Sequence, residues 1–146
     1  MFDWRWDFAF EILPRLLQAT LNTLAAAGIG YGIAVVLGLV FALAQRTPSR
    51  IVTLVVRECV EFIRSTPLVL QIFFVFFVGP QFGIRLSPWV AGMIAIGLHY
   101  SAYLSEVYRG GLEAVPKGQW EASQTIGMGY RTTLQRIILP QALRTA

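Results

Sequence analysis

Apolar residues dominate three long stretches of the chain, and the pattern predicts three membrane-spanning helices. A helix needs about 20 mostly apolar residues to cross the hydrocarbon core of a bilayer. The three stretches cover about residues 17–44, 51–79 and 88–110. The first has polar residues in its opening turns, so its continuous apolar part begins near Leu24. The third begins with Pro88 and Trp89, and tryptophan is typical of the membrane interface.

The second stretch changes character at Thr66-Pro67. Before this point, apolar residues recur with helical spacing from Ile51 to Arg64, and charged residues fill the opposite side. After it, Leu68 to Val78 is almost entirely apolar but too short to cross a bilayer alone. The pattern predicts one long helix that is amphipathic at its start and kinked near Pro67. Cys59 falls on the apolar stripe and is expected to be packed and inert.

Small residues in the first stretch are compatible with a helix–helix contact. Gly28 and Gly32 lie four residues apart, with Gly30 and Gly38 nearby. This spacing allows a second helix backbone to approach closely in lipid. The alternative is that a membrane helix simply tolerates these glycines, and the sequence leaves both interpretations open.

Composition also favours a membrane protein over a soluble domain. The chain has 146 residues, of which 55% are hydrophobic and 14% charged, whereas soluble domains carry about 25% charged residues. A single cysteine excludes an internal disulfide and makes a zinc cluster implausible. No nucleotide-binding or metalloprotease motif occurs, so no cofactor or metal is expected. The basic residues are clustered, and no nucleic-acid partner is expected.

The positions of the basic residues predict the orientation in the membrane. Between the first two apolar regions and in the amphipathic extension lie Arg46, Arg50, Arg57 and Arg64. After the third stretch come Arg109, Lys117, Arg131, Arg136 and Arg144. Only Arg85 lies between the second and third stretches. The positive-inside bias therefore predicts that the N-terminus and the Arg85 loop face outward, and that the segment after residue 110 is cytoplasmic. The acidic, aromatic N-terminus is not expected to be a cleaved signal peptide.

Polar residues within the third stretch are candidates for a solute pathway. His99, Tyr103 and Glu106 are spaced to share one face of a helix. Ionisable groups inside a span usually face the bundle interior or a watery cavity, so this face is a candidate pathway lining. Two alternatives stay open: Glu106 pairs with Arg109 at the interface, and His99 is a packing residue. An intramembrane hydrolase would require His99 and a serine in catalytic geometry, which this spacing does not establish.

A fixed pattern of residues follows the third stretch and resembles a known family motif. Glu121-Ala122-Ser123, Gly127 and Ile137-Ile138-Leu139-Pro140 match the spacing EAA-x3-G-x9-I-x-L-P. This is similar to the EAA motif of binding-protein-dependent ABC importer permeases, and Ser123 is its one departure. The flanks "AYLSEVYRGGLEAVPKGQWEAS", "LPQALR" and "FIRSTPLVLQ" resemble permeases for polar amino acids. "LSPWVAGMIAIGLHYSAYLSEVYRGG" looks closest to the permease subunit of ectoine/hydroxyectoine importers.

The resemblance implies a fold, partners and residue roles. The fold would be all-α, the first three spans of a five-span type I permease in a bacterial inner membrane. The last two spans of the family would be missing from these 146 residues, as in a fragment or a truncated product, or would be supplied elsewhere. The chain would be a transport component and not an enzyme. Its partners would be cytoplasmic ATPase subunits, a second permease subunit, an extracytoplasmic solute-binding protein and the lipid bilayer. Residues 119–138 would be the coupling segment, with the contact residues Glu121, Ala122, Ser123, Gly127, Ile137, Leu139 and Pro140.

The residues themselves predict how this segment folds. Gly127 can break or sharply turn a helix, which gives one short helix around Gln119–Ile126 and another around Tyr130–Ile138. The first would be a short cytoplasmic helix with small residues that can enter a groove on a partner. Two alternatives remain: an interfacial amphipathic helix without a partner, and a membrane-anchored interaction protein without transport activity.

Overall fold

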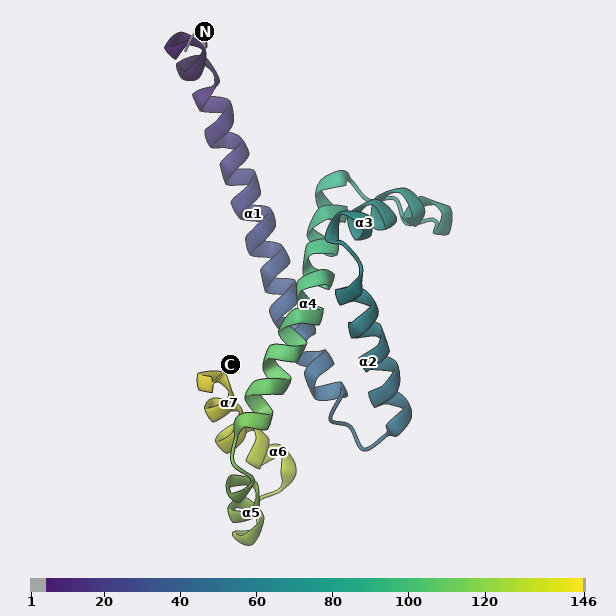
Figure 1. The fold of residues 1–146 in the computed structure, drawn as a ribbon, viewed down its shortest axis with the longest axis vertical. Coiled ribbons are helices and arrows are strands. Elements are labelled where there is room, and N and C mark those ends of the chain that lie inside the picture. The colour runs from purple at the N-terminus through teal and green to yellow at the C-terminus, as the bar shows by residue number, and fades with distance from the viewer. Residues whose placement is uncertain (1–4, 146) are drawn as a thin grey trace.

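The computed structural model describes residues 5–145, without the side chain of Thr145, and these residues form helices joined by short connections (Figure 1). No strand occurs among them, which confirms the all-α prediction for the described part of the chain. The acidic N-terminal segment discussed above begins outside this part. The helices are α1 (Trp6–Ala44), α2 (Arg50–Ser65), α3 (Leu68–Phe73), η1 (Phe74–Val78), η2 (Gly79–Phe82), α4 (Pro88–Ala114), α5 (Lys117–Thr125), α6 (Tyr130–Thr133), η3 (Leu134–Ile138) and α7 (Leu139–Thr145).

The first helix is longer than its apolar stretch predicts. α1 begins at Trp6 instead of near residue 17, and it contains Pro14. The apolar stretch indicates which residues lie in the hydrocarbon core, but a helix can continue beyond it into water. Glu11 and Arg15 are charged and exposed, and charged residues on an exposed surface do not end a helix. The N-terminal part of α1 consequently extends well beyond α4 (Figure 1).

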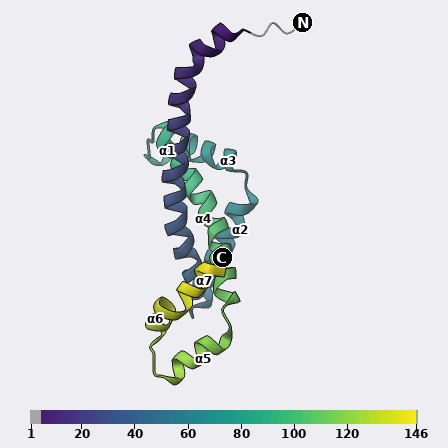
Figure 2. The same cartoon turned by 90° about the vertical axis from the view of Figure 1, so that its left-hand side faces the viewer.

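α1 and α4 cross and pack closely through a stripe of small residues (Figures 1 and 2). On α1 the buried residues are Gly30, Ala34, Gly38 and Ala42, spaced four apart. A Cβ atom at Gly38 would come within 2.9 Å of the Leu104 Cβ and 3.0 Å of the Ser101 carbonyl oxygen on α4. The helix backbones therefore approach to a distance that only glycine permits, as small residues allow in lipid.

Gly28 and Gly32, the pair four residues apart in the sequence analysis, do not make this contact. A Cβ atom at Gly28 or Gly32 would meet no atom within 4 Å among the described residues. The packing stripe instead contains Gly30 and Gly38, and it begins two residues after Gly28. Sequence spacing alone gives several equivalent small-residue pairs on one helix, and only the partner surface decides which of them is buried.

The second stretch forms two helices at a steep angle and not one kinked helix. α2 and the continuous α3–η2 region are bent by 106° at the break. Thr66 is extended, with φ −105° and ψ 136°, because the Pro67 ring disfavours helical backbone in the preceding residue. Gln71 fixes the bend: its Nε2 donates to the Ile63 carbonyl oxygen at 2.7 Å and to the Thr66 hydroxyl oxygen at 2.7 Å.

α2 turns its apolar stripe away from the rest of the chain. Val55 and Phe62 are exposed, and Cys59 is exposed as well. The expectation that Cys59 is packed is therefore wrong. The inward side instead holds the buried Val60 and part of the charged set, because this side faces polar groups on α4. The hydrophobic stripe of a membrane helix can face lipid or neighbouring helices, so its position does not identify the inner side.

The prediction of three membrane spans is not confirmed. By length and composition, α1 qualifies as a span, and the bent pair α2 with α3–η2 qualifies if it is counted as one. α4 has 27 residues, which is long enough, but it is not among these candidates. Its polar face, with His99, Tyr103 and Glu106, and its buried serines lower its mean hydropathy.

Candidate functional site

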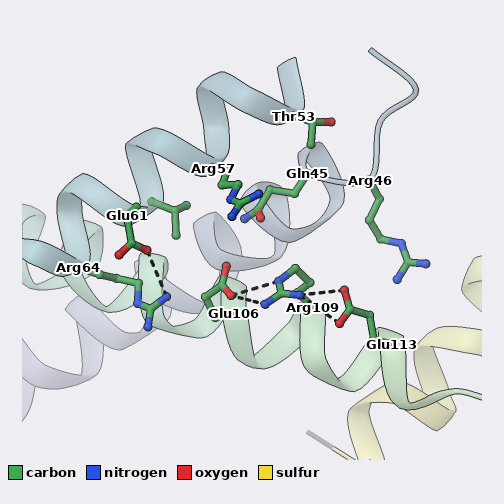
Figure 3. A pocket seen from close by; sticks show the side chains of 10 residues that line it. Gln45, Arg46, Thr53, Arg57, Glu61, Arg64, Glu106, Arg109 and Glu113 are labelled. Atoms are coloured by element: carbon green, nitrogen blue, oxygen red, sulfur yellow. Dashed lines mark hydrogen bonds and ion pairs between the residues drawn. The ribbon is translucent and has the colours of Figure 1, made fainter. Parts of the chain in front are cut away.

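A cavity of about 570 Å³ lies between the end of α1, α2 and α4. Charged side chains from α2 and α4 point toward one another here, and Gln45 follows the end of α1 (Figure 3). Its lining residues are Gln45, Arg46, Thr53, Arg57, Val60, Glu61, Arg64, Glu106, Arg109 and Glu113. One of the three predicted pathway residues, Glu106, is therefore in the wall of this cavity.

Glu106 belongs to an ion-pair network along α4. The Arg109 guanidinium donates to one Glu106 oxygen at 2.7 Å and to Glu113 at 2.9 Å (Figure 3). The residues are three and four apart, so they are neighbours on the helix surface. This geometry is the Glu106–Arg109 pairing that the sequence left open. It does not exclude a pathway role, because the pair also lines the cavity.

His99 and Tyr103 lie next to the α2–α3 break. Their rings are 5.1 Å apart, and the Arg64 guanidinium lies 5.4 Å from the Tyr103 ring centre. The Tyr103 hydroxyl donates to the Arg64 carbonyl oxygen at 3.3 Å. The His99 Nδ1 atom is buried and has no hydrogen-bond partner among the described residues. The predicted face thus contacts α2, while its His99 end lies outside the charged cavity.

The serines of α4 lie in the contact with α1, on a side that does not bring them to His99. Ser101 and Ser105 are fully buried, and their hydroxyls donate to the carbonyl oxygens of Leu98 and Ala102 in their own helix. Atoms of both serines are close to Gly38 of α1. No hydrogen bond joins either serine to His99 among the described residues, and the geometry gives a hydrolase no support.

The motif segment folds as two helices that meet at Gly127. α5 ends at Thr125, and Gly127 has φ +76°. The Gly127 N–H bonds the Gln124 carbonyl at 2.9 Å, and the Met128 N–H bonds the Ser123 carbonyl at 3.0 Å. These two bonds form a Schellman cap, which requires a left-handed residue at the position of Gly127. The predicted break at Gly127 is confirmed.

An apolar cluster holds this segment against the end of α4. The cluster consists of Leu112, Val115, Leu134, Ile138 and Ala142. Ile138, the variable position of the motif, is the most deeply buried at 0% exposure, whereas Ile137 and Leu139 are partly buried and Pro140 is exposed. Residues 134, 138 and 142 are spaced four apart, and this helical spacing indicates the buried face. The motif does not indicate it, because its fixed positions are Ile137, Leu139 and Pro140.

Of the motif residues on α5, Ser123 is buried and packs within the fold, whereas Glu121 and Ala122 are exposed. Ser123 is buried, and its hydroxyl donates to the backbone of Gln119 and Trp120 at 2.9 and 2.8 Å. A small residue is therefore required where the motif has alanine, and serine meets that requirement. Glu121 and Ala122 are exposed, as is Ile126 at 73%. This exposed side is available to a partner.

Trp120 connects α5 to the end of α1, a contact that the sequence analysis missed. The Arg46 guanidinium lies 5.5 Å from the Trp120 ring centre, and the Tyr130 ring stacks on Trp120 at 5.9 Å. All three residues line a second cavity of about 530 Å³ beside α5. A displacement of α5 would therefore be passed to the α1–α2 connection as well as to α4.

Comparison with known proteins identifies the family. Residues 34–146 match the family described as binding-protein-dependent transport system inner membrane component. The chain belongs to this family. It is 42% identical, over 98% of its length, to a probable amino-acid ABC transporter permease of Sinorhizobium fredii, and 38% identical, over 97% of its length, to an L-cystine transport system permease of Bacillus subtilis. A crystal structure of an amino acid ABC transporter with histidines is similar, with a TM-score of 0.87 and 29% identity over 99% of this chain and 67% of that one.

The relatives confirm the kind of protein but are longer. Homologous chains are permease components of ABC transporters, so the expectation of a transport component instead of an enzyme is confirmed. The chain spans 65% of the Sinorhizobium relative and 61% of the Bacillus relative. The fold of the described residues agrees with part of an amino acid ABC transporter chain, of which it covers 67%.

Proposed function

We propose that the chain forms part of the translocation pathway of a binding-protein-dependent ABC importer for a polar amino acid or a compatible solute such as ectoine or hydroxyectoine. The observation that carries the proposal is α5. This helix is capped at Gly127, presents Glu121 and Ala122 outward, and lies at the end of the packed α1–α4 pair (Figure 1). It coincides with the motif that resembles the coupling segment of such importers.

The packing of α5 supports a coupling mechanism. In this proposal ATP is hydrolysed by the partner ATPase subunits, and closure of their dimer displaces the two coupling helices. The displacement reaches α1 through Trp120 and Arg46, and α4 through the apolar cluster around Leu112 and Ile138. α1 and α4 then move together, because their contact is too close to slide. A second permease subunit and an extracytoplasmic solute-binding protein complete the proposed complex.

The relatives support an amino-acid-like solute. Their names refer to L-cystine, nopaline and glutamine, compounds that each carry an amino group and a carboxylate. Ectoine and hydroxyectoine rest on the sequence resemblance alone. A polar face on α4 with His99 and Glu106 suits a zwitterionic solute, since it offers a ring nitrogen and, in the Glu106–Arg109 pair, charges of both signs.

A biochemical measurement separates this importer from a membrane anchor. In the importer, the full-length chain is expected to co-purify with an ATPase subunit. A solute-loaded binding protein is expected to stimulate ATP turnover, because it binds one conformational state of the complex more tightly and raises the population of that state. An anchor would bind its partner without this stimulation. ATP turnover that ignores the loaded binding protein, in a complex that contains all subunits, would favour the anchor.

The proposed orientation places the N-terminus outside and α5 in the cytoplasm. In the fold, the α1–α2 connection and α5–α7 lie at one end of α4, and the η2 region lies toward its other end (Figure 1). Cysteines at Gln81 and Gln124, both exposed, are expected to be labelled from opposite sides in a Cys59→Ala background. An impermeant thiol reagent applied to intact cells should modify Gln81→Cys and leave Gln124→Cys unmodified; the reverse pattern would invert the topology.

The polar face of α4 gives a second prediction. In the assembled transporter, His99→Leu is expected to reduce uptake about 3- to 10-fold, the loss that follows when one hydrogen bond to a solute is removed. Complex assembly and basal ATP hydrolysis should stay unchanged. Ser101→Ala, on the α1-facing side of the same helix, is the matched control and should transport normally. Normal uptake kinetics in His99→Leu would make His99 a packing residue.

A further inference from the structure

We propose that the charged cavity between α1, α2 and α4 binds the phosphate group of an anionic phospholipid, separately from the solute. Basic pockets between membrane helices near the cytoplasmic surface are suited to acidic lipid headgroups. The position of this cavity in the cytoplasmic half of the membrane rests on the orientation given in the proposed function. The binding chemistry rests on the side chains of the cavity alone.

The charges in the cavity leave an excess of positive charge. Four arginines and three glutamates line it, which gives a formal charge of +1. Arg109 already engages Glu106 and Glu113, and Glu61 lies 3.8 Å from Arg64 (Figure 3). The three carboxylates are thus matched by two arginines, and Arg46 and Arg57 have no carboxylate partner among the described residues. A phosphodiester, with one negative charge, would balance the excess.

Hydrogen-bond donors in the cavity wall also lack acceptors. The Arg64 Nε and one Arg46 guanidinium nitrogen, Nη1, are buried and have no hydrogen-bond partner among the described residues. Buried N–H groups are paired in nearly all folded proteins. Guanidinium groups bind phosphate oxygens in a two-pronged geometry. The Arg46 guanidinium lies against Trp120 beside the second cavity, so Arg64 is the residue whose unpaired donor a phosphate in the charged cavity would satisfy.

The surroundings of the cavity favour a lipid over a soluble phosphate. α2 contributes Arg57 and Arg64 to the cavity, and the same helix presents exposed apolar side chains outward, including Leu54, Val55 and Phe62. Of these, Leu54 borders a shallow pocket together with Arg57, so an acyl chain could lie on this flank of α2 while the headgroup reaches the arginines. A free phosphate would gain nothing from an apolar flank, so the two sources differ in a measurable way.

Native mass spectrometry of the purified full-length chain tests the proposal with dioleoyl phosphatidylglycerol and dioleoyl phosphatidylcholine as probes. The wild-type chain is expected to retain phosphatidylglycerol about tenfold better, the factor that one charge-assisted hydrogen bond supplies. Arg57→Gln with Arg64→Gln should remove this preference, and Arg57→Gln alone should weaken it. Arg15→Gln with Arg85→Gln removes the same charge outside the cavity and should keep the preference.

Three outcomes would overturn the proposal. They are equal retention of the two lipids by the wild-type chain, an unchanged preference in the cavity variant, and full displacement of phosphatidylglycerol by millimolar inorganic phosphate, which would indicate a soluble anion. Arg57 has no ion pair to lose among the described residues, so the single variant keeps the test valid if the double variant unfolds. The measurement uses neither ATP nor solute, so a negative result for lipid binding would not contradict the importer proposal. An inverted cysteine-labelling pattern would instead place the cavity in the outer leaflet.

Discussion

Gly127→Val in the full-length protein is expected to insert normally into the membrane but to lose productive coupling to the ATPase. Gly127 has φ +76°, where a β-branched residue is strained by about 1–3 kcal/mol. A Cβ atom there would meet nothing within 4 Å, so the strain comes from the backbone and not from crowding. The variant either bears this strain or loses the Schellman cap, and α5 is then aimed differently.

The size of the effect follows from the strain. An energy of this order corresponds to a shift of about 5- to 150-fold in a conformational equilibrium, and uptake is expected to fall accordingly. Co-purification of the ATPase or its stimulation by loaded binding protein should fall with it. Membrane insertion should be unchanged, because the apolar segments that insert lie before this turn.

Matched variants separate the backbone from the side chain. Gly129 is two residues away, has φ −68° and also has open space around its Cβ position, so Gly129→Val should have a much smaller effect. Gly127→Asn should retain part of the activity, because asparagine tolerates the left-handed region better than other residues do. Full uptake and normal ATPase stimulation in Gly127→Val would show that the shape of this turn does not matter for coupling.

Gly38→Val is expected to disrupt the α1–α4 contact. Its Cβ would lie 2.9 Å from the Leu104 Cβ and 3.0 Å from the Ser101 carbonyl oxygen, both belonging to the facing helix. Overpacking of this kind costs about 1–3 kcal/mol, and here the obstacle includes backbone that cannot rotate away. The thermal unfolding midpoint of the purified chain should fall by several degrees, about the shift that such a loss produces.

Gly32→Val provides the control for this prediction. Gly32 lies on the same helix, and a Cβ atom there meets nothing within 4 Å among the described residues. The two variants have the same helix propensity and the same added volume, so a difference between them reports the close contact. Equal midpoints for Gly32→Val and Gly38→Val would show that α1 and α4 do not pack at this register.

The sequence predicted local features better than it predicted packing. The turn at Gly127 was predictable because one residue type and its spacing determine a backbone conformation. The register of the α1–α4 contact was not, since Gly28, Gly30, Gly32 and Gly38 are equivalent until a partner surface is known. The steep α2–α3 bend exceeds a proline kink because Gln71 stabilises it through contacts that no short motif reveals.

In the candidate site, too, the sequence predicted which residues share a helix face but not the contacts between distant segments. The shared face of His99, Tyr103 and Glu106 follows from helical periodicity, and the fold places Tyr103 and Glu106 toward α2. The Arg46–Trp120 contact joins residues that are far apart in sequence, so only the tertiary structure could show it. The burial of Ile138 does not follow from the motif, because the motif specifies fixed positions whereas burial follows the helical face.

Site-specific photo-crosslinking from α5 tests the central claim most directly. A photoreactive residue at the exposed Ala122, in the full-length complex with its ATPase and a second permease, is expected to crosslink to the ATPase subunit. The same residue at Leu24, exposed on α1, should crosslink to lipid or to another permease subunit and not to the ATPase. If a transport-active complex gives no ATPase crosslink from Ala122, α5 is not the coupling helix.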